Sequence, residues 1–221
     1  MCKTVIILVE GQSEETFIRD TVAPAFWPLN IFLETRNFAG NVNFDRFCLH
    51  MRNILKERDD TIISTMLDLY RLDKHFPGYL NINHLPEVYQ KVAKLEQQLH
   101  DYITVQYHCR PERFIPYIQP YEFEGLLFSD TNALIQIEPA WQKQVAELQA
   151  IRNAFETPEH INNSYETKPS KRLECLSPKY RKTRHGPLAA QRITLATIER
   201  ECAHFHQWME RLRALQNIHN I

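Results

Sequence analysis

The first strongly patterned stretch of the chain is the apolar run of residues 5–9, which ends directly in Glu10-Gly11. Five β-favouring residues without a polar interruption predict a central parallel strand that is covered on both faces. Residues 12–18 are polar and helix-like, Gly11 allows a turn, and Ser13 can cap the helix. The pattern therefore predicts a strand, a turn and a helix, with the Glu10 carboxylate at the strand's carboxyl end, where ligands of such sheets bind. The alternative is a solvated glutamate at a strand end.

The strand and helix patterns then repeat along the chain. Residues 31–38 are typical of a second strand, and apolar side chains recur at helical spacing between Phe44 and Leu55, with charged side chains on the opposite side. Residues 61–67 predict a third strand, which again ends at an acid, Asp68. Strands joined by an amphipathic crossover helix predict an α/β fold with a mostly parallel, Rossmann-like sheet flanked by helices.

The elements that follow are less regular. Residues 86–100 predict a long helix because their apolar side chains fall on one side. Residues 113–118 predict a fourth strand, whose internal Pro116 suits a sheet edge or a strand end. Residues 141–155 predict a further helix.

The last quarter of the chain differs in character from the rest. Residues 160–185 are polar and show no regular face, whereas residues 193–215 predict a long amphipathic helix with a break near Cys202. We therefore expect residues 1–155 to form the α/β core. Residues 156–221 are expected to add a basic, irregular segment and a C-terminal helix that packs on the core.

Composition narrows the classes of protein to be considered. The 221 residues are 43% hydrophobic and 24% charged, as in an ordinary globular protein, and the formal charge of −1 means that nucleic-acid binding requires a local basic patch. Five widely spaced cysteines without CxxC spacing argue against a disulfide framework and indicate a cytoplasmic protein. No run approaches the roughly 18 apolar residues of a membrane span. Five glycines, with neither a Walker phosphate loop nor a GxGxxG motif, argue against nucleotide hydrolysis and dinucleotide binding.

Three acid clusters follow predicted strands: Glu10, Asp68 and the pair Glu122 and Glu124. Parallel strands bring their carboxyl ends to one edge of the sheet, so these acids can converge. Clustered carboxylates suit Mg²⁺ or Mn²⁺, whereas the alternative is three unrelated polar strand ends. Glu122 and Glu124 alternate by two, so on an extended strand both would face the same side, whereas on a helix they would diverge. We favour Glu122 as a ligand because it lies nearer the strand end.

Positive charge is concentrated in one stretch near the C-terminus. Its members are Lys168, Lys171, Arg172, Lys179, Arg181, Lys182 and Arg184. Such a cluster is typical of a surface that contacts a phosphate backbone, and one of its cations could stabilise the transition state of phosphodiester cleavage. The alternatives are a solvated loop or a patch that docks onto an acidic partner protein.

Two of these acidic segments resemble the motifs of the Toprim fold, namely Val9-Glu10-Gly11 after one apolar strand and Asp68 after another. With the segments 65–70, 121–128 and 169–173, the resemblance extends over nearly the whole chain to a family of Toprim-like bacterial proteins, related in site pattern to the overcoming-lysogenization-defect (OLD) nucleases. Members are often encoded beside ABC-type or AAA-type ATPases. The resemblance therefore implies a nuclease of an anti-phage defence system with an ATPase partner.

The resemblance also implies roles for individual residues. Glu10 matches the glutamate that serves as metal ligand or general acid/base, and Asp68 matches the first aspartate of a paired-aspartate motif. Tyr70 stands where the second aspartate is expected, which puts a metal shared by two aspartates in doubt unless Asp73 or Glu124 completes the site.

Together these features predict a Mg²⁺- or Mn²⁺-dependent endonuclease acting on DNA or RNA, as a monomer or a homo-oligomer. Its metal ligands would be Glu10, Asp68, Glu122 and Glu124, with Glu10, Asp68 and Lys171 as catalytic residues. Its nucleic-acid-binding residues would be Lys168, Lys171, Arg172, Lys179, Arg181 and Lys182. One alternative is a non-catalytic Toprim-like regulatory subunit that binds an ATPase partner. Another is a phosphatase or phosphotransferase of small molecules, which predicts a deep closed pocket.

Overall fold

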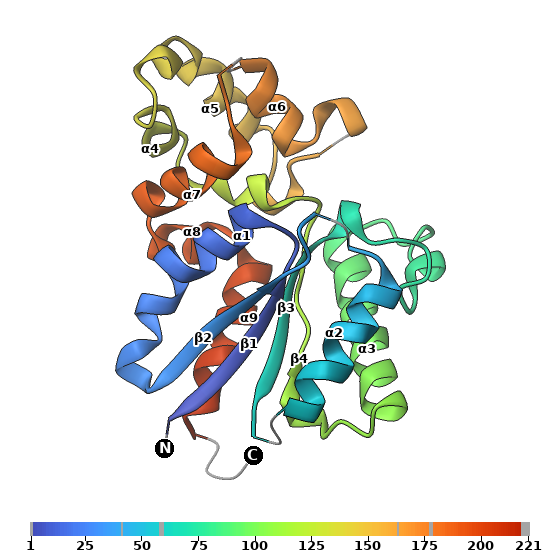
Figure 1. The fold of residues 1–221 in the computed structure, drawn as a ribbon. Helices are drawn as coiled ribbons and strands as arrows, with labels where there is room; N and C mark the ends of the chain where they lie inside the picture. Colours follow the sequence, from blue (N-terminus) through green and yellow to red (C-terminus); the bar gives the residue numbers. More distant parts are fainter. Residues whose placement is uncertain (1, 41, 58–59, 163, 177–178, 218–221) are drawn as a thin grey trace.

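The fold is built around a parallel sheet in a computed structural model that describes residues 2–40, 42–57, 60–162, 164–176 and 179–217. The strands lie in the order β2-β1-β3-β4, and β5 pairs with β3 further along (Figure 1). The strands span Lys3–Val9 (β1), Ile31–Asn37 (β2), Ile62–Asp68 (β3), Phe114–Ile115 (β4) and Ile118–Gln119 (β5). Every pairing is parallel, which confirms the predicted α/β class.

Both faces of the sheet are covered, so β3 is buried along its whole length and β1 is buried from Val5 to Val9. Ile6 and Leu8 of β1 point to one core, which α2 (Phe44–Glu57) and α3 (Val88–Gln106) cover. Val5, Ile7 and Val9 point to the opposite core, because successive side chains of a strand alternate between faces. The helices on that side are α1 (Gln12–Phe17), α7 (Lys182–Ile193), α8 (Leu195–Glu201) and α9 (Ala203–Ala214).

Three further helices gather beyond the carboxyl ends of β1 and β3, at the top of Figure 1. They are α4 (Thr131–Ile135), α5 (Val145–Asn153) and α6 (Pro169–Leu176). α1 continues as a π-helical turn, Ile18–Val22. Turns of 3₁₀ helix connect the larger elements: Ala23–Ala25, Trp27–Leu29, Leu69–Arg71, Tyr79–Asn81, Pro111–Arg113, Phe123–Ser129, Pro139–Gln144, Pro158–His160, Tyr165–Thr167 and Leu215–Asn217.

The predicted fourth strand is split into β4 and β5 at Pro116, which has no N–H to donate to the ladder. Side chains of β3 replace the missing ladder bonds. The Ser64 hydroxyl donates to the carbonyl of Ile115 (2.6 Å), and Thr65 Oγ1 both donates to the carbonyl of Tyr117 and accepts its N–H (2.8 Å each). β4 lies at the edge of the sheet, as the internal proline predicts.

The C-terminal quarter is more helical than the sequence pattern indicates. The segment expected to be irregular contains α6 and begins α7, because its apolar residues pack into the core on one side, with Ile161 and Leu173 among them. The predicted break at Cys202 is confirmed, since α8 ends at Glu201 and α9 begins at Ala203. Among the described helices, none has both the length and the apolar character needed to cross a membrane.

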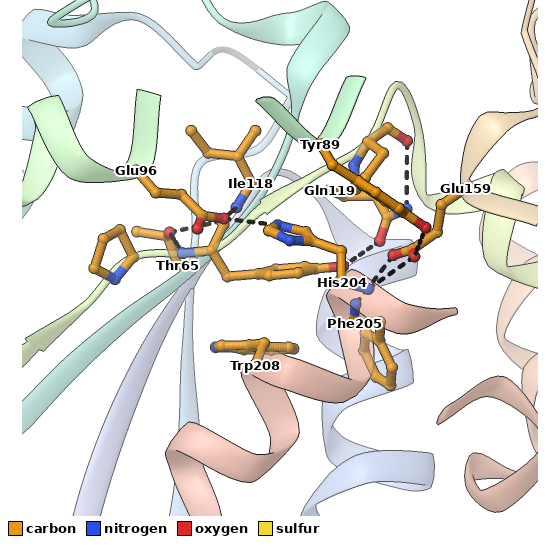
Figure 2. A network of polar contacts seen from close by, with 12 residues as sticks. Thr65, Tyr89, Glu96, Ile118, Gln119, Glu159, His204, Phe205 and Trp208 are labelled. Carbon is orange, nitrogen blue, oxygen red and sulfur yellow. Dashed lines mark hydrogen bonds and ion pairs between the residues drawn. The ribbon is translucent and has the colours of Figure 1, made fainter. Parts of the chain in front are cut away.

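A buried polar network joins α9 to the opposite side of the sheet (Figure 2). The Glu159 carboxylate accepts the backbone N–H groups of His204 and Phe205 (3.0 Å each) and so caps α9. The His204 ring lies 2.9 Å from Glu96 of α3, and the same Glu96 oxygen accepts the N–H of Ile118 (2.7 Å). One histidine therefore ties α9 to α3 and, through Glu96, to β5.

Replacing His204 by glutamine should lower the free energy of unfolding by about 1–3 kcal/mol below neutral pH, the range for a hydrogen bond to a charged group. Burial alone would lower the pKa of His204, but Glu96 and Glu159 hold it above its ordinary value of 6.5. A histidine whose pKa is higher in the folded than in the unfolded protein stabilises the fold fully when the pH is below its pKa in the unfolded state. This stabilisation is lost as the pH rises through its pKa in the folded state. Urea unfolding of wild type and His204→Gln at about pH 6 and about pH 8 measures this difference.

His206→Gln is the matched control, because His206 is exposed on the same helix. A stability difference between wild type and His204→Gln that does not shrink toward high pH would contradict a charged His204.

Candidate active site

Glu10 and Glu14 both enter the site from the junction of β1 and α1. The helix begins at Gln12 with Gly11 as its N-cap residue, and Glu14 Oε2 accepts the Gly11 N–H (3.0 Å). Gly11 is extended, with φ of −154°, so the turn here does not depend on a left-handed conformation. The expectation that Ser13 caps the helix is wrong, since Ser13 is buried within the first turn. Glu14 takes the capping role and remains at the site.

Asp68 ends β3 and holds the next part of the site in place. Its Oδ1 atom accepts the backbone N–H of Phe123 (2.8 Å), so the segment after β5 is tied to the end of β3. A 3₁₀ helix, Phe123–Ser129, begins at this bond. Glu122 is extended whereas Glu124 lies in the helix, so the two glutamates do not share one face of a strand as expected, and their side chains go to different partners.

Lys182, the first residue of α7, places its ammonium among three of the acids. Its Nζ atom lies 3.4 Å from Glu124 Oε2, 3.5 Å from Glu14 Oε1 and 3.8 Å from Asp68 Oδ2. These separations exceed a normal hydrogen bond, so the ammonium neutralises the acids from their centre without being bound closely to any one of them.

Glu10 completes the group of acids and faces a second cation. Its Oε1 atom lies 3.2 Å from Nε of Arg71, whose side chain is half exposed. We name Glu10, Glu14, Asp68 and Glu124 the carboxylate cluster; each is at most 4% exposed. Each residue of the cluster has at least one buried oxygen without a hydrogen-bond partner: Glu10 Oε2, Glu14 Oε1, Asp68 Oδ2, and both Oε1 and Oε2 of Glu124.

The protonation of the cluster reflects burial and mutual repulsion. Burial raises the pKa of Glu10 to about 7, with repulsion from Glu14 adding to the shift and Lys182 and Arg71 opposing it. Burial likewise raises the pKa of Glu124 to about 7 against the attraction of Lys182, and it raises the pKa of Asp68 well above its ordinary value. Near neutral pH the cluster therefore retains protons that isolated carboxylates would have lost.

The cluster opens to solvent through a pocket of about 540 Å³. Glu10, Glu14, Arg71 and Lys182 line it, together with Gly40 from the segment after β2. Carboxylate oxygens, a guanidinium and an ammonium therefore meet in one solvent-accessible space. Such a space can hold a cation and an anionic group side by side.

Glu122 lies beside the cluster but binds other groups. Its carboxylate accepts Lys168 Nζ (2.7 Å) and the N–H of Ser170 (3.1 Å) at the start of α6. Burial alone would raise the pKa of Glu122, but these hydrogen bonds hold it below its ordinary value. The structure thus places Glu122 and Lys168 in a contact that docks α6 beside the site.

The other basic residues predicted to bind nucleic acid lie in α6 and just before α7. Lys171 pairs with Glu174 at 2.7 Å, and Arg172 donates to the Thr167 carbonyl and lies over the Phe155 ring. Lys179 and Arg181 are exposed. In the described contacts, Lys182 is the member of this set that forms ion pairs with the carboxylate cluster.

Of the two residues that could replace a second aspartate, Glu124 joins the cluster and Asp73 does not. Asp73 Oδ2 accepts the N–H of Phe44 (2.9 Å) at the start of α2. The sequence interpretation missed Glu14 and Arg71. Glu14 could have been found from its position three residues after the N-cap Gly11, as in a capping box. Arg71 carries no sequence signal, because its ion pair with Glu10 depends on the turn after β3.

A group of possible metal ligands also lies outside the carboxylate cluster. Among the described residues, one oxygen or nitrogen atom from each of Glu199, His206 and Glu210 lies within 4.8 Å of the others. Arg213 pairs with both carboxylates of this group, at 2.6 and 2.8 Å, which accounts for their proximity. No three residues of the carboxylate cluster are this close, because Lys182 stands between them. An ion can take that place only when the ammonium moves aside and the acids turn inward.

Comparisons with known proteins agree with this architecture. The C-terminal region of the Burkholderia pseudomallei OLD protein is similar to this chain at 16% identity, with a TM-score of 0.51 and coverage of 96% of this chain and 98% of that one. The C-terminal region of the Xanthomonas campestris pv. campestris OLD protein has 14% identity, a TM-score of 0.49 and 96% coverage of both chains. The first likeness supports, at the level of the fold, the relation to OLD proteins that the sequence resemblance implies.

A search of curated proteins finds no match. Residues 9–213 match the family described as Domain of unknown function (DUF4276). That match covers most of the sequence and includes every residue of the carboxylate cluster. The chain therefore belongs to the DUF4276 family.

Proposed function

We propose that this protein is a metal-dependent nuclease that cleaves DNA or RNA at the carboxylate cluster. The observation that carries the proposal is the set of buried carboxylate oxygens that lack hydrogen-bond partners and surround a single ammonium. An unsatisfied buried charge is costly, so a site that keeps four such groups has a use for a cation there. The pocket that joins this cluster to solvent gives a substrate access.

The donor set fits a hard divalent ion. The cluster supplies only oxygen ligands, which Mg²⁺ and Mn²⁺ prefer. When all groups are ionised, its four carboxylates together with Lys182 and Arg71 carry a net formal charge of −2, which a divalent cation would neutralise. We assign the ligand role to Glu10, Glu14, Asp68 and Glu124. Glu122 supports the site through Lys168 and α6. When bound, such an ion stabilises charge on phosphoryl oxygens and lowers the pKa of water.

The chain's own residues supply binding and proton transfer. Lys182 and Arg71 flank the pocket and would hold the phosphate of the substrate. Glu10 lines the pocket, and its Oε2 atom, which has no hydrogen-bond partner, would serve either as a ligand of the ion or as the base that takes a proton from attacking water. Lys182 thus takes the phosphate-binding role that the sequence assigned to Lys171, because it is Lys182 that lies in the cluster.

The biological setting is proposed on the sequence resemblance. It would be anti-phage defence with an ABC-type or AAA-type ATPase as partner, the ATPase controlling when the nuclease acts. One observation favours the alternative of a non-catalytic subunit that binds the ATPase. Tyr70 stands where the Toprim motif has a second aspartate, so one ligand of the family pattern is missing. Metal binding and cleavage assays separate the two functions.

Asp68→Asn and Glu14→Gln should each reduce Mg²⁺- or Mn²⁺-dependent cleavage more than about 100-fold, because changes to outer-shell partners alone cost 10- to 100-fold. The assay follows plasmid DNA, single-stranded DNA and total tRNA, with and without the neighbouring ATPase. Glu34→Gln is the control, since Glu34 is an exposed acid of β2 that does not line the pocket. Cleavage that survives both cluster substitutions would place the active site elsewhere, whereas no cleavage under any condition would favour the non-catalytic subunit.

Metal binding should strengthen as pH rises from about 5 to about 8, because an ion must displace the protons that Glu10 and Glu124 hold. An acid whose pKa is higher in the folded than in the unfolded protein destabilises the fold as the pH rises from its pKa in the unfolded state through its pKa in the folded state. The metal-free protein should therefore lose stability over this range, and added Mn²⁺ should restore it. Thermal unfolding with and without Mn²⁺ measures the effect, which Asp68→Asn should abolish. An equal Mn²⁺ shift at both ends of the range would show that the ion binds elsewhere.

Lys182→Met should separate metal binding from cleavage. The variant removes the ammonium that competes with an ion, so the Mn²⁺-induced rise in unfolding temperature should be at least as large as in wild type. Cleavage should fall by about 100-fold or more, the usual effect of removing a group that stabilises transition-state charge. Lys171→Met, which removes a surface ion pair with Glu174, should stay within about fivefold of wild type. The reverse order of effects would restore Lys171 as the catalytic lysine.

A further inference from the structure

An aromatic pair, Tyr70 and Tyr121, is carried by the two segments that hold Asp68 and Glu124. Tyr70 follows Asp68 by two residues, and Tyr121 directly precedes the segment that carries Glu124. The Tyr70 N–H donates to the Tyr121 carbonyl (3.2 Å), and the two ring centroids are 5.3 Å apart at an angle of 48°. Tyr70 is 41% exposed, so one side of the pair faces solvent.

Several features show that the chain holds this pair in a defined position. Tyr121 has a positive φ of 59°, a left-handed conformation that is unfavourable for a bulky residue and that recurs at functional sites. Burial raises the pKa of both hydroxyl groups, and a hydrogen bond with the Asn162 side chain opposes that shift. Three segments of the chain therefore converge to orient one partly exposed ring.

The neighbours of the pair are suited to a polynucleotide. Arg71 follows Tyr70 in the chain and reaches the pocket, where it lies 3.2 Å from Glu10, and Lys182 faces the same pocket. An exposed ring that can bind a base is thus followed directly in the chain by a cation that reaches the pocket and can bind phosphate. Aromatic rings bind unpaired bases by stacking, whereas the bases of an intact duplex are already stacked on one another.

We propose that Tyr70 stacks on an unpaired nucleobase next to the scissile phosphate, so that the substrate is a single-stranded or locally unpaired nucleic acid. The inference rests on the proposed nuclease function and specifies its substrate class. Tyr121 and Asn162 position the Tyr70 ring, and Arg71 holds the adjoining phosphate. The tyrosine that replaces an acid of the motif thereby has a binding role, while Glu14 and Glu124 complete the ligand set.

The test measures cleavage and binding of a labelled single strand, its duplex, and a set of strands in which one base at a time is removed to leave an abasic site. Binding is measured by fluorescence anisotropy in an Asp68→Asn background so that the strand is not cut. Wild type should prefer the single strand. Tyr70→Ala should weaken its binding about 5- to 100-fold, the range for losing one stacked base, whereas Tyr70→Phe should retain binding.

The decisive result is non-additivity. Both proteins compared here carry Asp68→Asn, and one of them also carries Tyr70→Ala. At one position beside the cut, removing the base should weaken binding of the strand to the protein that keeps Tyr70. The same removal should leave binding to the Tyr70→Ala protein unchanged. A merely structural role for Tyr70 would instead add the same loss at every position. Trp27→Ala is the matched control, because Trp27 is a more exposed aromatic residue (55%) before β2, at the opposite end of the sheet.

The outcomes for the two proposals are distinguishable. Suppose that the wild type cleaves nucleic acid, but the losses of binding from Tyr70→Ala and from base removal simply add, or single strand and duplex bind equally well. Either result would overturn the stacking inference and leave the proposed nuclease function in place. Binding that depends on Tyr70 and on one base, without cleavage under any metal condition, would support the stacking site and overturn the nuclease.

Discussion

The structure depends on the balance between four buried carboxylates and one ammonium. Transferring each charge from water into the protein costs several kcal/mol, and the four acids repel one another. Lys182 offsets part of this cost, and raised pKa values at Glu10 and Glu124 offset more by retaining protons. Because these compensations are incomplete, with several oxygens left without hydrogen bonds, the rest of the fold must hold the acids in place.

The surrounding elements supply that support from both sides of the sheet. The Asp68 carboxylate binds the Phe123 N–H, which fixes Glu124, and Glu14 is fixed by the Gly11 N–H. The contact between Glu122 and Lys168 docks α6, and α7 packs against α1 in the core that also receives α9. Farther away, Glu159 caps α9 and His204 joins α9 to α3. Polar contacts at helix ends thus turn an unfavourable cluster into a stable pocket.

Much of this arrangement could be predicted from local pattern and topology. The apolar runs of β1 and β3 and the periodicity of α2 and α3 identify the sheet, and parallel topology predicts that Glu10, Asp68 and the acids after β5 converge. The choice between Glu122 and Glu124 could not be predicted, because it depends on where a 3₁₀ helix begins. Nor could the position of Lys182, since it depends on α7 packing against elements more than a hundred residues away. Long-range packing, rather than propensity, decides which charge lies in the site.

Tyr70 shows how one departure from a motif can be accommodated. An acid at this position would add a further negative charge to a cluster that Lys182 and Arg71 already fail to neutralise. In the proposed metal site, Glu14 from α1 and Glu124 from the 3₁₀ helix would supply oxygens from other directions, so four carboxylates would remain without an acid at position 70. The position is then free for a side chain that faces solvent, and the neighbouring Tyr121 and Arg71 favour an aromatic group that can contact a substrate. A lost ligand in a recurring motif is therefore not by itself evidence of lost activity, because ligands are defined by position in space and not by position in the motif.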